Sequence, residues 1–174
     1  YLEVLAKTEI PFEEKKKEYL EILKSDANSY IKEEILMQLI TTPFEEKEEF
    51  LKIAMQSKNL KVRQAVVKSL DKIPTSFYDE YITLLEDESY ITQEIALNML
   101  WSQFAEKRVA LLEKTKGRVG FNDRNLEIQW LTLALITTDF DETNKTVYYD
   151  RLLTLSKSPF ESPVRINSIT NLLY

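Results

Sequence analysis

A five-residue sequence occurs twice in this chain and indicates an internal repeat. Pro-Phe-Glu-Glu-Lys stands at residues 11–15 and again at residues 43–47. An aromatic–leucine pair follows each copy within two helical turns, Tyr19-Leu20 after the first and Phe50-Leu51 after the second. Self-similarity at about 30 residues is typical of helical repeat proteins, in which each unit is a hairpin that buries its apolar face by stacking on its neighbours. Such proteins usually act as scaffolds or binding surfaces.

A second periodic pattern extends over the whole chain. When the expected second helix of each hairpin is aligned, a β-branched residue recurs at one position. Its five occurrences are Ile31, Val62, Ile91, Ile128 and Val164. Apolar or small residues follow four positions later, and large apolar ones eight positions later, which predicts one buried helical stripe. The first helices have a register of their own, at Tyr19, Phe50 and Tyr81 and at Leu23, Ala54 and Leu85.

Composition supports long helices joined by short turns. The 174 residues include two glycines and five prolines, 44% are hydrophobic and 30% are charged, as in an ordinary soluble domain. We therefore predict an all-α, HEAT-like α-α superhelix of about five antiparallel helical hairpins, with a partial hairpin before them. It forms a single domain over residues 1–174, and we expect this to be a fragment of a longer chain. Helices are expected at about residues 2–9, 12–25, 29–41, 43–57, 60–73, 76–87, 90–103, 105–116, 124–137, 142–157 and 162–173.

Turn residues agree with these helix limits. Thr42 with Glu45 is typical of a capping box, and Ser76 with Asp79 repeats the pattern. Short polar residues suited to cap a helix stand just before second helices, and Gly117 suits a left-handed position after a helix. The second-helix caps are Asn59, Ser89 and Ser162.

Charge and residue types exclude several classes of site. The formal charge is 23 − 29 = −6 with the acids spread along the chain, which disfavours nucleic acid as a partner. With no histidine and no cysteine, the chain has no Ser-His-Asp triad, Cys-His pair or thiolate or imidazole metal site. It also has no glycine-rich phosphate loop. No apolar run is long enough to span a membrane, so we predict no membrane insertion. We assign no catalytic residue, metal or cofactor, and both cytoplasm and periplasm are compatible with the sequence.

Two short motifs have a formal match to chemistry, and each has a structural explanation that we prefer. Ser29 and Lys32 fit the Ser-x-x-Lys pattern of serine acyl-enzymes, but Ser29 is explained as a helix cap. Asp139, Asp141 and Glu142 could suggest calcium, although the twelve-residue loop with its central glycine is absent. Acidic residues just before a helix also favour its positive end, and we adopt that explanation.

Three residues on second helices are candidates for contacts on the concave face of the repeat: Arg63, Trp130 and Arg165. The arginines share one repeat position, with Lys32 beside them in the alignment. They could anchor an acidic ligand, or they could form a ladder with carboxylates of adjoining repeats, which we favour. A large aromatic on a second helix is a possible anchor for a partner and, more often, part of the core.

Residues 59–70, Asn-Leu-Lys-Val-Arg-Gln-Ala-Val-Val-Lys-Ser-Leu, resemble the second helix of a HEAT repeat, and residues 163–168 are a weaker copy. The whole arrangement is similar to the C-terminal helical domain of bacterial aminopeptidase N-like zinc metallopeptidases. That resemblance implies a non-catalytic accessory domain that packs on a separate zinc-bearing catalytic domain of the same chain and shapes substrate access. The alternative is a free-standing scaffold that binds another protein or peptide. HEAT-like DNA glycosylases have basic surfaces and rank below both.

Overall fold

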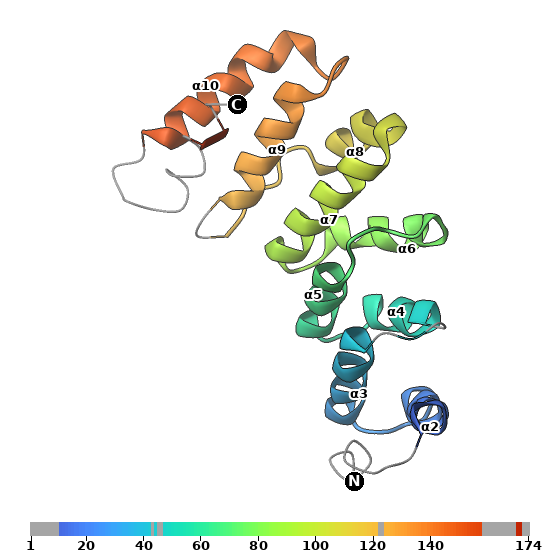
Figure 1. Cartoon of the computed structure of the whole chain (residues 1–174). Helices are drawn as coiled ribbons and strands as arrows, with labels where there is room; N and C mark the ends of the chain where they lie inside the picture. The colour runs from blue at the N-terminus through green and yellow to red at the C-terminus, as the bar shows by residue number, and fades with distance from the viewer. Residues whose placement is uncertain (1–10, 43, 45–46, 122–123, 158–169, 172–174) are drawn as a thin grey trace. The chain divides into compact units, whose positions relative to one another are not determined.

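The computed structural model describes residues 11–42, 44, 47–121, 124–157 and 170–171 (Figure 1). Within these ranges every regular element is a helix, so the predicted all-α class is confirmed. Contacts between residues divide the chain into two compact units, residues 1–70 and 71–174. The HEAT-like superhelical arrangement and the single domain stay predictions. No helix in the described ranges has the length and apolar composition of a membrane span.

The described part of the first unit contains two helical hairpins. They are α2 (Phe12–Lys24) with α3 (Ser29–Thr41), and α4 (Lys47–Met55) with α5 (Leu60–Ser69). Helix α3 packs against α2, α4 and α5, and α4 packs against α5. In Figure 1, α3 and α5, the second helices of the two hairpins, lie next to each other. The buried apolar side chains between these helices are Tyr19, Leu23, Ile35, Leu36, Leu39, Ile40, Phe50, Leu51, Ala54, Met55, Val62, Val66 and Val67.

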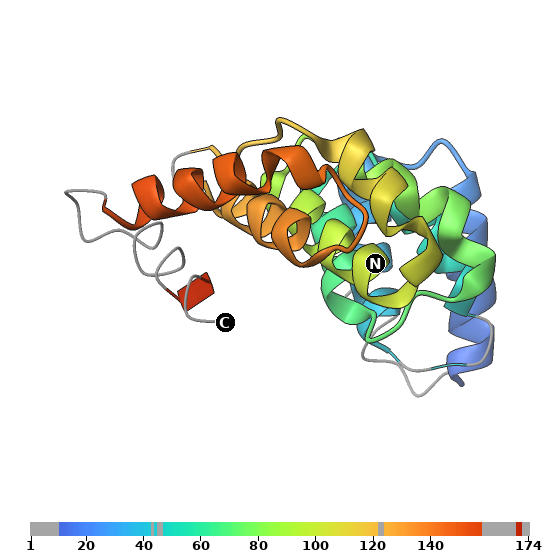
Figure 2. The same ribbon diagram turned by 90° about the horizontal axis from the view of Figure 1, so that it is seen from above.

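The second unit continues the alternation of first and second helices. A bent first helix consists of η1 (Thr75–Phe77), α6 (Tyr78–Tyr81) and η2 (Ile82–Glu86), and α7 (Tyr90–Gln103) packs on it. Next come η3 (Ala105–Lys107), α8 (Arg108–Thr115) and α9 (Asn125–Ile136), then η4 (Glu142–Asn144) and α10 (Lys145–Ser156). Helix α9 packs against α7, α8 and α10. Figure 2 shows α9 alongside α10 from a second direction.

Most predicted helix limits agree with these elements to within two residues where the residues are described. The helix expected at 60–73 ends at Ser69, and in the helix expected at 43–57 Phe44 is not helical and α4 ends at Met55. One segment differs in type: residues 76–87, expected as an α-helix, are largely 3₁₀. The Thr83 hydroxyl there donates to the Glu80 carbonyl at 2.6 Å, a local bond of the kind that competes with α-helical pairing. The expected helix 2–9 lies outside the described residues. So does most of 162–173, of which residues 170–171 are helical.

The first-helix register predicted from the sequence is confirmed in all three hairpins. Tyr19, Phe50 and Tyr81 are buried, and Leu23, Ala54 and Leu85 are buried one turn further on. Because each pair lies four residues apart, both members face the second helix of their hairpin.

The second-helix register is confirmed in α5 and wrong in α7. Val62 and Val66 are fully buried, whereas Ile91 is 49% exposed and its neighbour Thr92 is fully buried. Val62 and Thr92 are each the third residue of their helices, so counting from the helix start aligns the two correctly. The preference for a β-branched apolar residue shifted the sequence alignment by one position. In the other second helices the outcome is mixed. Ile35, Leu39 and Ile128 are buried as the stripe predicts, whereas Ile31 is 36% and Ile136 58% exposed. Val164 lies outside the described residues.

The cap predictions have mixed outcomes. Asn59 accepts from the Lys61 amide at 2.7 Å and Ser89 from the Thr92 amide at 3.3 Å, as expected. Gly117 has the predicted left-handed backbone, with φ +81°. Ser162 lies outside the described residues.

Two other cap assignments, those of Ser29 and Ser76, are different in the structure, and that of Thr42 is not tested. The residue that caps α3 is Asn28, which accepts from the Tyr30 amide at 2.9 Å, so Ser29 is the first helical residue. Thr42 follows the last residue of α3, and its hydroxyl donates to the Gln38 carbonyl at 2.8 Å. Its expected partner Glu45 lies outside the described residues, so the capping box stays a prediction. Ser76 lies inside η1, whose preceding residue is Pro74.

Candidate functional site

Arg63 forms a link within its own hairpin. Its side chain is half-buried in the first turn of α5, and Nη1 donates to the Ser57 carbonyl oxygen at 2.7 Å, just after α4 ends. Lys32 makes the same kind of bond from α3 to the carbonyl of Ser25, the residue that ends α2. In the second unit, Gln93 Nε2 donates to the Asp87 carbonyl at 2.5 Å.

These three bonds define one recurring feature. In these three hairpins, a donor side chain from the first turn of the second helix binds a carbonyl group at or just after the end of the first helix. Carbonyl groups at a helix end lack partners inside their helix, and the bond supplies a donor from the neighbouring helix. This role differs from both predicted roles of the basic column, the ladder between repeats and the ligand anchor, which stay predictions.

The link predicts a stability effect for Arg63. Replacing it in Arg63→Met keeps an apolar stem but removes the donor, and we expect a loss of about 1–2 kcal/mol in the free energy of unfolding. Urea unfolding followed by circular dichroism measures the loss. Lys61→Met, at an exposed site two residues earlier, is the matched control and should change stability by less than about 0.5 kcal/mol. Equal effects of the two substitutions would contradict the role of the bond.

Trp130 lies in the core of the second unit. Only 5% of the residue is exposed, its indole nitrogen donates to the Leu112 carbonyl at 3.1 Å, and its ring makes edge contacts with Phe140 and Tyr148. The indole therefore presents almost no surface to a partner. Arg165, the third predicted contact, lies outside the described residues.

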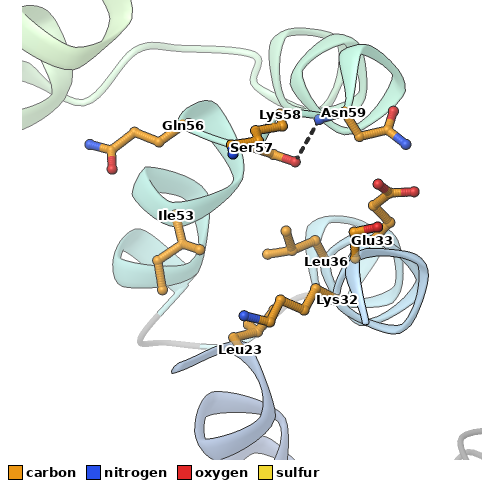
Figure 3. A pocket seen from close by; sticks show the side chains of 10 residues that line it. Leu23, Lys32, Glu33, Leu36, Ile53, Gln56, Ser57, Lys58 and Asn59 are labelled. Carbon is orange, nitrogen blue, oxygen red and sulfur yellow. Dashed lines mark hydrogen bonds between the residues drawn. The ribbon is translucent and has the colours of Figure 1, made fainter. Parts of the chain in front are cut away.

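A pocket with a volume of about 340 Å³ opens between the two hairpins of the first unit (Figure 3). Leu23, Leu36 and Ile53 converge on it from α2, α3 and α4. Its more polar lining residues are Ser29, Lys32, Glu33, Gln56, Ser57, Lys58 and Asn59. Sequence reasoning singled out Ser29 and Lys32 for another purpose and missed the pocket. In the structure the Lys32 amine donates to a backbone carbonyl, which is a structural role.

Two cavities of about 330 Å³ each lie in the second unit and share Glu94 of α7. We call them together the Glu94 groove. The first is lined also by Glu88, Ser89, Tyr90, Ile91, Phe121 and Leu126. The second is lined also by Asn98, Asn125, Ile128, Gln129, Thr132, Leu133, Thr170 and Asn171. Among the described residues that line the two cavities there are two carboxylates, Glu88 and Glu94, and no lysine or arginine.

Asp141 joins the turn before α10 to two other segments. Its carboxylate accepts from Lys116 Nζ at 2.9 Å, from Asn144 Nδ2 at 2.7 Å and from the Tyr148 hydroxyl. These hydrogen bonds, that from Tyr148 above all, hold the pKa of Asp141 well below its ordinary value. The carboxylate thus serves the fold, and no group of three or more metal-ligating side chains occurs among the residues that the structure describes.

The low pKa of Asp141 predicts acid sensitivity. Asp141 has a lower pKa in the folded state than in the unfolded state, where the pKa of an aspartate is about 3.9. Its ionised form therefore stabilises the fold at a pH above about 3.9, and this stability is lost as the pH falls toward the folded-state pKa. We expect the Tm of the wild type to fall more steeply than that of Asp141→Asn between about pH 5 and pH 2. The control is Asp139→Asn, in the same turn and also with positive φ. Parallel pH profiles for the wild type and Asp141→Asn would contradict this role.

Glu127 forms a second charged link, between α9 and α10. It lies 2.7 Å from Arg151 Nε and 2.8 Å from Arg124 Nη1. Burial raises the pKa of Glu127, but hydrogen bonds from Arg151 and Arg124 outweigh it and hold the pKa below its ordinary value. Both charged links lie outside the Glu94 groove.

No family model matches this chain, and neither a curated protein nor a solved structure shows significant similarity to it.

Proposed function

We propose that residues 1–174 form a non-catalytic helical-repeat accessory domain of a larger protein. The finer architecture that we propose is a HEAT-like α-α superhelix of about five hairpins. The observation that carries the proposal is the recurring hairpin link at Lys32, Arg63 and Gln93, because it gives three successive hairpins one construction. Proteins built from stacked similar hairpins present extended surfaces that bind other domains or peptides.

For the parent protein, we propose a zinc aminopeptidase-type metallopeptidase. The support is the resemblance drawn from the sequence alone, an acidic and histidine-free series of expected helical hairpins, to the C-terminal domain of that class. In such a protein the zinc ligands would belong to a separate catalytic domain, and the present segment would pack on that domain and shape the access of substrate. No catalytic, metal or cofactor-binding residue is assigned to the segment itself.

The test uses the full-length parent protein. We expect a His-Glu-x-x-His motif upstream of this segment and hydrolysis of leucine p-nitroanilide that is lost with a zinc chelator and restored by zinc. Deleting the helical segment should change the ratio of kcat/KM values for a decapeptide and for leucine p-nitroanilide. A parent without the motif and without zinc-dependent hydrolysis would remove the metallopeptidase proposal.

The alternative is a free-standing scaffold that binds another protein or peptide. The observation that favours it is the group of exposed apolar side chains at the Glu94 groove, Tyr90, Ile91 and Phe121. Exposed aromatic residues beside a cavity are typical of protein interaction surfaces. A parent without peptidase activity, together with a specific polypeptide retained by the 174-residue chain, would support this alternative.

A further inference from the structure

We propose that the pocket between the two hairpins of the first unit binds a free α-amino acid with an apolar side chain. We call it the interhairpin pocket, and Figure 3 shows the side chains that line it. The proposal goes beyond the accessory-domain function, because it assigns a small-molecule site whichever parent protein is correct. It rests on three properties of the pocket: an apolar wall, a carboxylate and an ammonium group, the last two without partners.

The apolar wall is the first step. Leu23 and Leu36 are buried and Ile53 is half-buried, and the three side chains converge on the pocket from α2, α3 and α4. The volume of about 340 Å³ is near the lower end of the range for small-molecule sites, which is about 300–1,000 Å³. A small ligand with an aliphatic side chain against this wall therefore removes apolar surface from water.

Two charged side chains of the lining are the second step. Glu33 of α3 is half-buried, and Lys58, in the turn between α4 and α5, is exposed. Within the part of the chain that the structure describes, neither side chain has a hydrogen-bond or ion-pair partner. They have opposite charges and line one pocket, yet they do not pair with each other. Lys32, the other cation among the described lining residues, already binds the Ser25 carbonyl.

These two unpaired groups indicate a ligand that carries both charges. An ammonium group can donate to Glu33, and a carboxylate can accept from Lys58, both in charge-assisted hydrogen bonds. An apolar acid would leave Glu33 without a cation and bring a like charge near it, and an apolar amine would do the same to Lys58. An α-amino acid has both charges on one carbon atom, together with a side chain that can meet the apolar wall.

The position of the two groups adds a consequence for stability. Glu33 belongs to the first hairpin and Lys58 to the second, so an amino acid that binds both joins the two hairpins. A ligand that binds only the folded chain stabilises it in proportion to its occupancy of the site. Saturating L-leucine should therefore raise the Tm of the chain.

The experiment titrates the isotope-labelled 174-residue chain with L-leucine and follows its amide signals by NMR. We expect saturable shifts at the amides of Glu33, Ser57, Lys58 and Asn59, which line the pocket. Glycine lacks the side chain, N-acetyl-L-leucine lacks the ammonium group, and L-leucinamide lacks the carboxylate. Each of the three should bind at least about tenfold more weakly than L-leucine, equivalent to about 1.4 kcal/mol.

Two substitutions assign each charge of the ligand to its partner. Glu33→Gln should weaken the binding of L-leucine about tenfold and should not weaken that of N-acetyl-L-leucine, which has no ammonium group. Lys58→Met should weaken L-leucine by a similar factor and should not weaken L-leucinamide, which has no carboxylate. The matched controls are Glu34→Gln and Lys61→Met, at exposed neighbouring positions that do not line the pocket. Both should leave the affinity for L-leucine unchanged.

Several outcomes would overturn the proposal. These are no saturable shift with L-leucine, shifts confined to amides outside the pocket, or equal affinities for L-leucine and its two singly charged derivatives. Equal losses for Glu33→Gln and Glu34→Gln would do so as well, once the amide spectrum of each variant shows that it is folded. The site is established if L-leucine loses its preference over N-acetyl-L-leucine in Glu33→Gln and over L-leucinamide in Lys58→Met.

Discussion

Trp130→Ala should lower the free energy of unfolding by about 3–5 kcal/mol, the usual cost of truncating a large buried aromatic side chain. The indole is 5% exposed and lies between Phe140 and Tyr148, with ring centroids 5.9 Å and 5.2 Å away. Both contacts are edge-on, a geometry worth about 0.5–1.5 kcal/mol beyond the buried area. The substitution also leaves the Leu112 carbonyl without its indole donor.

The measurement is urea unfolding followed by circular dichroism at 222 nm, and Phe121→Ala is the control. Phe121 is also a large aromatic side chain of the second unit but is 73% exposed, so its truncation should cost less than about 0.5 kcal/mol. If Trp130 instead served a docking surface, its truncation would leave stability almost unchanged and would weaken the binding of a partner. That result would contradict the core position found here.

The helix limits and the first-helix register could be predicted because their signals are local. A polar cap such as Asn59 acts on an amide two residues away, and the aromatic residues at 19, 50 and 81 recur at a constant spacing. Large aromatic side chains on an amphipathic helix usually lie on its buried face, so their regular spacing indicates which face of each first helix is buried. All three are buried.

The candidate site could not be predicted in the same way. The Glu94 groove combines α7 with Phe121 and with α9, and no local pattern relates these segments. Sequence reasoning sought the site in Arg63 and Trp130 from their shared position on second helices. Arg63 binds a carbonyl in its own hairpin, and Trp130 lies in the core. A side-chain bond to the main chain leaves no mark in the identity of the accepting residue, so the Arg63 link had no sequence signal.

The misplaced register of α7 has a simple cause. Residues at the buried positions of its first turn are Thr92 and Gln93, both polar, whereas the apolar Ile91 is exposed. An alignment that rewards apolar side chains therefore selects Ile91. Gln93 is buried because its amide nitrogen binds the Asp87 carbonyl, so a hydrogen bond took precedence over hydrophobicity at this position.

Two substitutions in α7 test this register with the second-largest expected effect. Leu97 is fully buried, and Leu97→Ala should cost about 2–5 kcal/mol of the free energy of unfolding through the cavity that it leaves. Ile91→Ala removes a side chain of similar size that is 49% exposed, and it should cost less than about 1 kcal/mol. In the sequence alignment Ile91 is equivalent to the buried Val62. The alignment therefore predicts a large loss of stability for Ile91→Ala. Urea midpoints of the two variants decide between the registers, because a larger loss for Ile91→Ala than for Leu97→Ala is possible only if α7 is rotated to bury Ile91.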